Sequence, residues 1–284
     1  MRALAARPPG QALVRGRGLR LDSSSELEEV QPELGWVCLD RDGQTQVGLE
    51  GKKLPAVAQM LELYLPLCLA NGGGSTVFGH LGQSLDGQIA TRSGASRYVS
   101  GPENLRHMHH LRALCDAVIV GASTVEQDDP QLTTRLVPGP SPTRVVIDPT
   151  LRLPAERQVF QDRAARTLIV CARGRSNGHR FGEAELCEVD AEDGVMPPAA
   201  IVAALHERGL KRLFVEGGGV TISRFLAARA LDRLHITICP LFIGKGRPGI
   251  LLPPIEELGQ ALRPRTRRFS LGDDVLFDCD IVCS

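Results

Sequence analysis

Three consecutive glycines in the last third of the sequence follow an apolar run and could hold a phosphate group. The run 213–216 ends in the carboxylate of Glu216, glycines 217–219 come next, and an amphipathic segment starts near Thr221. Glycines between a strand and a helix let backbone N–H groups approach a ligand, and the helix start adds unpaired donors. The spacing matches neither G-x-G-x-x-G nor a Walker A loop. We expect a phosphate site here, with a turn that needs glycine only for its geometry as the alternative.

Two further polar segments could carry chemistry if the fold brings them together. Residues 118–135 hold a strand-like start, two hydroxyl side chains, an Asp-Asp-Pro turn and an arginine. Residues 80–100 run from a histidine through an Asp-Gly turn into a polar loop with one aromatic residue. Alone, Asp-Gly is only a hairpin signal, and the acidic pair lacks the further carboxylates that a metal site needs.

The elements that must position these segments alternate from residue 76 onward. Short β-branched runs predict strands at 76–82, 117–121, 143–148, 167–171, 212–215, 234–239 and 275–282. The stretches between them predict helices at 103–114, 198–208 and 221–228. This alternation is typical of an α/β layer with a largely parallel sheet, and the long connection before the last strand favours an antiparallel edge.

The first 75 residues have a different character. Residues 1–22 are rich in Arg, Ala and Gly without the apolar core of a signal peptide, so we expect a disordered tail. A strand-like segment at 35–39 surrounds the one tryptophan, an apolar helix-like run covers 56–69, and a glycine-rich linker follows at 71–75. The predicted division is a tail over 1–22, an extension of unassigned role over 23–74 and a domain over 75–284.

Composition restricts the possible partners. The 33 Lys and Arg residues balance 33 Asp and Glu residues, which gives no support for a nucleic-acid partner. Eight cysteines occur without a Cys-x-x-Cys pair, so we expect reduced thiols and no metal site. His107, His109 and His110 have no ligand at matching spacing and predict a solvated helix face. No apolar run of about 18 residues is present, so we expect a cytoplasmic protein without a membrane span.

Four motifs occur in one order: S-L-D-G-x-I-A from Ser84, G-A-S-R-Y-V-S-G-P-E from Gly94, a long segment ending in D-D-P-x-L-T-x-R at Arg135, and V-E-G-G-G-x-T from Val215. Over about residues 75–284 this order resembles the reductase domain of bacterial bifunctional riboflavin biosynthesis proteins, which is similar in fold to dihydrofolate reductase. The resemblance implies an α/β fold with a mostly parallel sheet, flanking helices and an antiparallel C-terminal edge. It also implies a homodimer that uses NADPH to reduce 5-amino-6-(5-phosphoribosylamino)uracil at the ribose C1′.

The resemblance assigns roles to individual residues. Cofactor contacts are implied for Gly82, Tyr98, Thr124, Asp128, Gly217, Gly218, Gly219, Val220 and Thr221. Substrate contacts are implied for Ser96, Arg112, Leu132, Arg135 and Glu216. The implied catalytic residues are His80 and Glu216. Two arginines can grip a phosphate, and a carboxylate can accept hydrogen bonds from ribose hydroxyls. Arg173 and Arg175 could meet the 2′-phosphate of NADPH, with a simple basic loop as the alternative.

The chain departs from the family pattern in two ways. His80 stands where the family usually has a lysine, and it could donate a proton only when protonated. The deaminase motifs H-x-E and P-C-x-x-C are absent from the sequence, so we expect no deamination. The histidine keeps two alternatives open: the same fold acting on another pterin or pyrimidine such as dihydrofolate, or a non-catalytic nucleotide-binding relative.

Overall fold

The computed structural model of the chain describes residues 11–12, 19–20, 36–39, 45–49, 52–53, 55–69, 75–96, 99–176, 181–192 and 194–282. The chain divides into two compact units, Met1–Ser75 and Thr76–Ser284.

The first unit contains short strands and one long helix. Strands β3 (Trp36–Leu39), β4 (Thr45–Leu49) and β5 (Lys52–Lys53) form an antiparallel sheet. Strand β1 (Gln11–Ala12) pairs with β2 (Leu19–Arg20), and helix α2 (Pro55–Leu69) follows β5. The strand expected around the tryptophan and the helix expected over the apolar run are both present. Most of the expected tail at 1–22 and of the linker at 71–75 lies outside the described residues.

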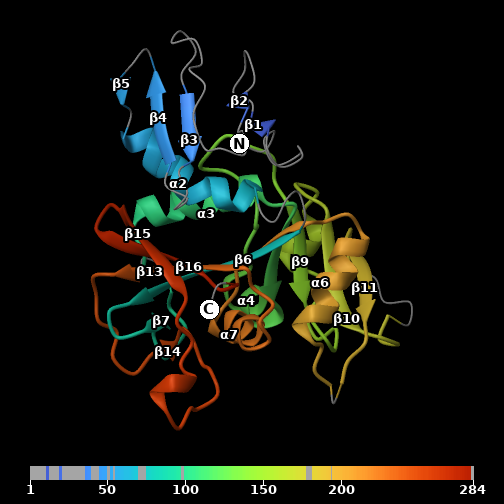
Figure 1. Cartoon of the computed structure of the whole chain (residues 1–284). Coiled ribbons are helices and arrows are strands. Elements are labelled where there is room, and N and C mark those ends of the chain that lie inside the picture. The colour runs from blue at the N-terminus through green and yellow to red at the C-terminus, as the bar shows by residue number, and fades with distance from the viewer. Residues whose placement is uncertain are drawn as a thin grey trace. The chain divides into compact units, whose positions relative to one another are not determined.

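The described part of the second unit is built on a nine-stranded sheet with the order β11-β10-β9-β8-β12-β6-β13-β16-β15 (Figure 1). Its strands are β6 (Thr76–Ser84), β8 (Ala117–Gly121), β9 (Thr143–Ile147), β10 (Thr167–Ala172), β11 (Glu185–Val189), β12 (Arg212–Val215), β13 (Arg233–Cys239), β15 (Arg265–Leu271) and β16 (Asp274–Asp280). All pairings from β11 to β13 are parallel, whereas β16 runs antiparallel to β13 and β15 antiparallel to β16. The predicted α/β fold with an antiparallel C-terminal edge is confirmed.

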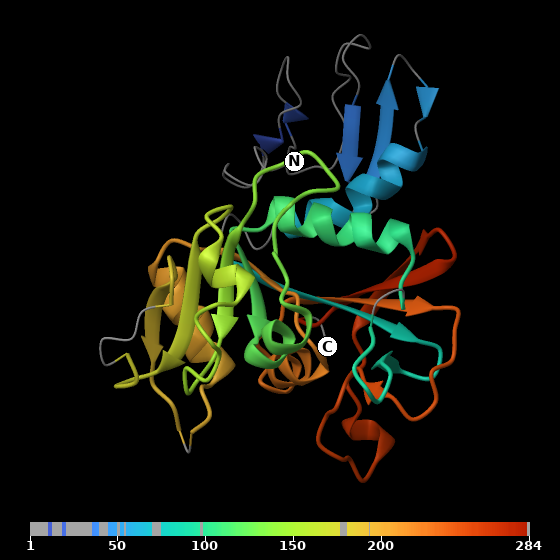
Figure 2. The ribbon, with the colours of Figure 1, turned by 180° about the vertical axis from the view of Figure 1, so that it is seen from behind.

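Helices cover both faces of this sheet. The helices are α3 (Pro102–Leu114), α4 (Ala122–Asp128), α5 (Gln158–Gln161), α6 (Pro198–Glu207), α7 (Gly219–Ala227) and the 3-10 helix η2 (Leu258–Gln260). Neighbouring residues of a strand point to opposite faces, so Leu81 and His80 of β6 face different layers. Leu81 packs in one core cluster with Ile201 of α6 and Phe225 of α7. His80 lies under α3, whose Asn104 it contacts. Figures 1 and 2 show α3 and α7 on opposite sides of β6.

The central strands are buried because both of their faces are covered. Parallel sheets of this kind carry continuous apolar runs rather than alternating ones, and residues 117–120 of β8 accordingly have no exposed surface. The described cysteines are likewise buried and outside disulfides: Cys68, Cys115, Cys171, Cys187, Cys239 and Cys279. Across the described ranges, no helix is both long and apolar enough to cross a membrane.

Candidate functional site

A cavity of about 630 Å³ brings the three polar segments of the sequence together. The segment that starts in β6 contributes His80 and Ser96, the segment after β8 contributes Thr124, and the segment after β12 contributes Glu216. The second and third of these segments begin at the carboxyl ends of neighbouring parallel strands, where α/β folds commonly bind ligands. The shape of the sheet therefore explains why residues far apart in the sequence share one site.

The structure places most of the expected site residues on the wall of this cavity. Those in the lining are His80, Gly82, Ser96, Thr124, Asp128, Glu216, Gly217, Gly218, Gly219, Val220 and Thr221. Among the described residues that line the cavity, Arg112, Leu132 and Arg135 do not occur. Tyr98 lies outside the described residues. Their individual roles toward a ligand stay predictions.

The glycine loop connects β12 to α7 through backbone alone. Helix α7 starts after Gly218, which caps it without a side-chain hydrogen bond, so the first N–H groups of the helix keep their capacity to bind an anion. The N–H of Gly218 donates to Thr124 Oγ1 at 3.3 Å and thereby joins the two loops. A Cβ atom at Gly219 would lie 2.2 Å from the carbonyl oxygen of Gly249, so this position requires glycine for close backbone contact.

Glu216 is held by Arg112 in a paired, nearly buried arrangement. Arg112 Nε donates to Glu216 Oε2 at 2.6 Å, and a second guanidinium nitrogen donates to Oε1. The side chains are 9% and 12% exposed. Burial alone would lower the pKa of Arg112, but the adjacent carboxylate outweighs burial and raises it. The third guanidinium nitrogen donates to the carbonyl of Thr133 at 3.0 Å. Arg112 thus holds Glu216, which lines the cavity, and its predicted contact with a substrate phosphate stays a prediction.

The loop after α4 is fixed to α3 by a hydrogen bond of its backbone. The N–H of Arg135 donates to His109 Nδ1 at 2.9 Å, and the Arg135 guanidinium donates to Thr133 Oγ1 at 2.9 Å. Leu132 is buried with a φ of 55°, a left-handed conformation that is uncommon for leucine. Arg135 itself is exposed, so its guanidinium lies outside the lining while its backbone belongs to this anchored loop.

His80 lies in a buried polar environment that opposes a positive charge. Its Nε2 is 2.9 Å from Asn104 Oδ1 and 3.1 Å from Thr237 Oγ1. Burial, together with the nearby His235, lowers the pKa of His80 to about 3. The imidazole is therefore uncharged near neutral pH. Burial thus opposes the protonated form that a proton donor would need, a desolvation cost that was not visible in the sequence, and the catalytic role of His80 stays a prediction.

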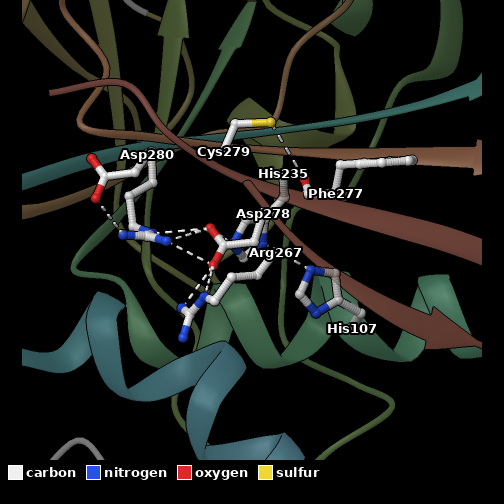
Figure 3. Close-up of polar contacts among 8 residues, drawn as sticks. His107, His235, Arg267, Phe277, Asp278, Cys279 and Asp280 are labelled. Atoms are coloured by element: carbon white, nitrogen blue, oxygen red, sulfur yellow. Dashed lines mark hydrogen bonds and ion pairs between the residues drawn. The ribbon is translucent and has the colours of Figure 1, made fainter. Parts of the chain in front are cut away.

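The prediction that His107 and His109 lie on a solvated face of α3 is wrong. His107 is 1% exposed and His109 is 6% exposed. His107 stacks on His235 of β13, with ring centroids 5.2 Å apart, and His109 accepts the N–H of Arg135. Both histidines sit on the side of α3 that meets the sheet and the anchored loop. Their polar type indicated solvent, but His107 meets the buried His235 (Figure 3) and His109 meets the backbone N–H of Arg135, and both partners lie far away in the sequence.

Other arginines line the cavity in place of those proposed for a 2′-phosphate. Arg173 pairs with Asp190 outside the lining, which favours the basic-loop alternative for that segment. The lining instead includes Arg152, Arg224 and Arg247. Arg224 lies in α7, at the end of the segment that the family resemblance implies for the pyrophosphate of the cofactor. The only sequence feature that could have pointed to Arg247 of β14 (Arg247–Pro248) is the glycine-rich segment around it. Arg247 reaches the cavity because β14 pairs with β7 (Gln88–Ala90).

Asp128 is the acidic group of the lining on the α4 side. Partial burial raises the pKa of Asp128, and the nearby Arg247 charge opposes that rise. Arg247 also donates a hydrogen bond to the side chain of Gln127, the residue that precedes Asp128. The turn that follows has Asp129 with a φ of 39°, which ends α4 in a left-handed conformation. The Asp-Asp-Pro sequence therefore places Asp128 in the cavity lining, whereas the backbone of Asp129 ends the helix and its carboxylate accepts the N–H of Gln158 at 3.0 Å.

Comparison with known proteins agrees with this geometry. The chain is 34% identical over 206 residues to the 2,5-diamino-6-ribosylamino-4(3H)-pyrimidinone 5′-phosphate reductase of Methanothermobacter thermautotrophicus, covering 69% of this chain and 93% of that protein. It is 31% identical to the riboflavin biosynthesis protein RibD of Aquifex aeolicus over 68% of this chain, but it spans only 54% of that relative.

A solved structure shows the same fold. The riboflavin biosynthesis reductase Rib7 of Saccharomyces cerevisiae superposes with a TM-score of 0.64 at 22% identity, over 79% of this chain and 99% of that one. A family model described as the RibD C-terminal domain matches residues 75–268, which is more than half of the chain. The family resemblance expected from the four motifs is confirmed, and the chain belongs to the RibD C-terminal domain family.

Proposed function

We propose that the chain is an NADPH-dependent reductase of a phosphorylated ribosylaminopyrimidine in riboflavin biosynthesis. The observation that carries this proposal is one cavity lined by the glycine loop at the start of α7, by the carboxylate of Glu216 and by the imidazole of His80. The names of the relatives support the substrate class, because one is a pyrimidinone 5′-phosphate reductase and another is a riboflavin biosynthesis protein.

The lining fits a nicotinamide dinucleotide. Residues 217–219 are glycines and present only their backbone. No side chain caps the start of α7, which suits a pyrophosphate. The apolar part of the lining suits an adenine ring and includes Ile147, Pro149, Met196, Pro198 and Ile201. When bound, a reduced nicotinamide would supply the hydride that reduces C1′ of the ribose. The chain's own residues then have to orient the sugar and exclude water.

The polar side chains of the cavity have distinct parts in this orientation. Glu216 is paired with Arg112 and can accept hydrogen bonds from two ribose hydroxyls. The Ser96 hydroxyl can donate to or accept from the same sugar or its phosphate. Two arginines of the lining, Arg224 of α7 and Arg247 of β14, carry guanidinium groups that can balance phosphate charge.

An assay of the full chain tests the proposal. NADPH oxidation should be followed with 5-amino-6-(5-phosphoribosylamino)uracil and with the 2-amino pyrimidinone 5′-phosphate for which the Methanothermobacter relative is named. We expect turnover with at least one of these substrates and a C1′-reduced ribityl product by mass spectrometry. Turnover with dihydrofolate alone, or the absence of NADPH binding by calorimetry, would contradict the proposal. The same assay with NADH in place of NADPH measures the preference for the 2′-phosphate of the cofactor. The chain is also predicted to form a homodimer, which light scattering can check.

A further inference from the structure

The carboxylate of Asp86 holds two segments of the chain together, although Asp86 is not one of the described residues that line the cavity. Asp86 belongs to the S-L-D-G motif and lies in the turn between β6 and β7. Its Oδ2 accepts the N–H of Gly244 at 2.7 Å, and its Oδ1 accepts the N–H of Ile243 at 3.2 Å. The Ser84 hydroxyl donates to Oδ1 at 2.5 Å. This hydroxyl first, and then the N–H of Gly244, lower the pKa of Asp86, so the carboxylate is charged at neutral pH.

Backbone hydrogen bonds attach the second of these segments, residues 241–249, on both sides of the carboxylate. The N–H of Leu85 donates to the carbonyl of Leu241 at 2.9 Å. The N–H of Gly249 donates to the carbonyl of Gly87, also at 2.9 Å. Strand β14 lies within the segment and pairs with β7 in a two-stranded sheet (Figure 1). The carboxylate therefore binds the middle of a segment whose two ends are attached to β7 and to the turn before it.

Arg247 extends from this segment to helix α4. Its guanidinium donates a hydrogen bond to the side chain of Gln127 in α4. The guanidinium also lies against Gly94, where an added Cβ atom would come within 2.9 Å of one of its nitrogens. The φ of Gly94 is 99°, a backbone conformation that likewise favours glycine. Gly94, Gln127 and Arg247 all line the cavity, so the guanidinium connects the wall that β14 forms to the wall that α4 forms.

The positive charge of Arg247 has no ion-pair partner in the described part of the chain. Arg152, another arginine of the lining, is by contrast paired with Glu126 at 2.7 Å. Burial raises the pKa of Asp128, and the charge of Arg247 opposes that rise without reversing it. The guanidinium of Arg247 therefore has N–H donors left for a bound anion, and a phosphate group matches its planar, two-pronged geometry.

We propose that Arg247 binds a phosphate group of a ligand in the cavity, and that Asp86 is a positioning residue that holds the segment of Arg247 against β7. Without the Asp86 carboxylate, the N–H groups of Ile243 and Gly244 lose their acceptor, and the segment keeps only its attachments at the two ends. The inference rests on the proposed function for the identity of the ligand. A phosphate of NADPH and the phosphate of the ribosylaminopyrimidine are two sources of the same chemistry, and separate binding measurements distinguish them.

Calorimetry of the full chain with three ligands tests the role of Arg247. The ligands are NADPH, inorganic pyrophosphate, and 5-amino-6-(5-phosphoribosylamino)uracil added together with NADP+, which has no hydride to transfer. The test variant is Arg247→Gln. The control is Lys245→Gln, which removes the same charge from an exposed residue two positions away. We expect Arg247→Gln to weaken the binding of at least one ligand by about tenfold to about a hundredfold, and Lys245→Gln to weaken none by more than about twofold.

The ligand that binds more weakly identifies the source of the phosphate. Weaker NADPH binding assigns Arg247 to a phosphate of the cofactor, whereas weaker binding of the pyrimidine assigns it to the substrate. The role of Arg247 is overturned if none of the three ligands binds more weakly to Arg247→Gln than to Lys245→Gln. A wild-type chain that binds pyrophosphate, but neither NADPH nor the pyrimidine, refutes the proposed function alone, because the loss of pyrophosphate binding in Arg247→Gln still supports the phosphate site.

A double-mutant cycle tests whether Asp86 acts through Arg247. Asp86→Ala should weaken the affected ligand about fivefold when Arg247 is present, but less than about twofold in the Arg247→Gln background. Asp86→Asn keeps one oxygen acceptor and should lose less, and it replaces Asp86→Ala in the cycle if the alanine variant does not fold. Asp273→Asn is the control, because it removes an exposed carboxylate from the turn between β15 and β16, and it should bind as the wild type does. Equal losses with and without Arg247, or wild-type binding by the Asp86 variant, would overturn the positioning role.

Discussion

Acidification should destabilise this protein through its buried histidines well before its carboxylates are protonated. Burial lowers the pKa of His80 to about 3 and that of His107 well below its usual value. In the unfolded chain both imidazoles titrate near the ordinary value of about 6.5. Below that value the unfolded state binds protons that the folded state does not, so the free energy of unfolding falls as the pH falls. Between about pH 7 and about pH 5 each histidine should remove about 2 kcal/mol, or about 4 kcal/mol for the pair.

Urea unfolding followed by circular dichroism in matched buffers measures this loss. His107→Leu removes one of these titrating groups, so the loss of the variant between the two pH values should be about 2 kcal/mol smaller than that of the wild type. Leu111→Ala serves as the control, because Leu111 is equally buried on the same helix and cannot titrate. That control should lose about 2–5 kcal/mol at both pH values alike. A His107→Leu variant that keeps the wild-type dependence on pH would refute the assignment of an uncharged, buried His107.

Two further substitutions test the cavity wall. Gly219→Ala would place Cβ 2.2 Å from a backbone oxygen of Gly249 and should cost about 1–3 kcal/mol of stability and weaken NADPH binding about tenfold by calorimetry. Gly218→Ala is its control, since the new Cβ would lie 3.5 Å from Thr124 Oγ1, an ordinary contact; equal effects of the two would contradict the close-contact argument. Arg112→Met leaves Glu216 without its partner and should cost about 3 kcal/mol in urea unfolding, because the pair is nearly buried. Adding Glu216→Gln should recover part of that loss, and strict additivity in the double-mutant cycle would show that the pair is not coupled.

The central strands could be predicted from the sequence because they are buried on both faces. Strands β8 and β12 begin and end at the predicted residues. The elements that were missed lie at the sheet edges or next to the site. Strand β15 contains three arginines and is largely exposed, so it lacks the apolar pattern that predicts a strand. Helix α4 has seven residues and two hydroxyl side chains at its start, which gave it the character of a loop.

The cavity was predictable as a set of residues but not as a set of contacts. Motif order brought His80 and Glu216 to one site, but it did not reveal that the Arg112 guanidinium donates to Glu216 and to the carbonyl of Thr133. The burial of His107 depends on His235, 128 positions away along the chain. The residue pattern of α3 does not indicate the contact between His107 and His235, because the same helix sequence would also suit a solvent-exposed helix face.

The position of Asp278 in the last strand of the sheet has a consequence for the order of folding. β16 must dock against β13 before this carboxylate can reach His235. Chains fold progressively during synthesis, and contacts between distant segments form late. Until the hairpin of β15 and β16 docks, His235 has no carboxylate beside it and β13 is an open edge of the sheet. A nascent chain can therefore assemble the glycine loop early, whereas His235 meets Asp278 only when the C-terminal hairpin closes the sheet.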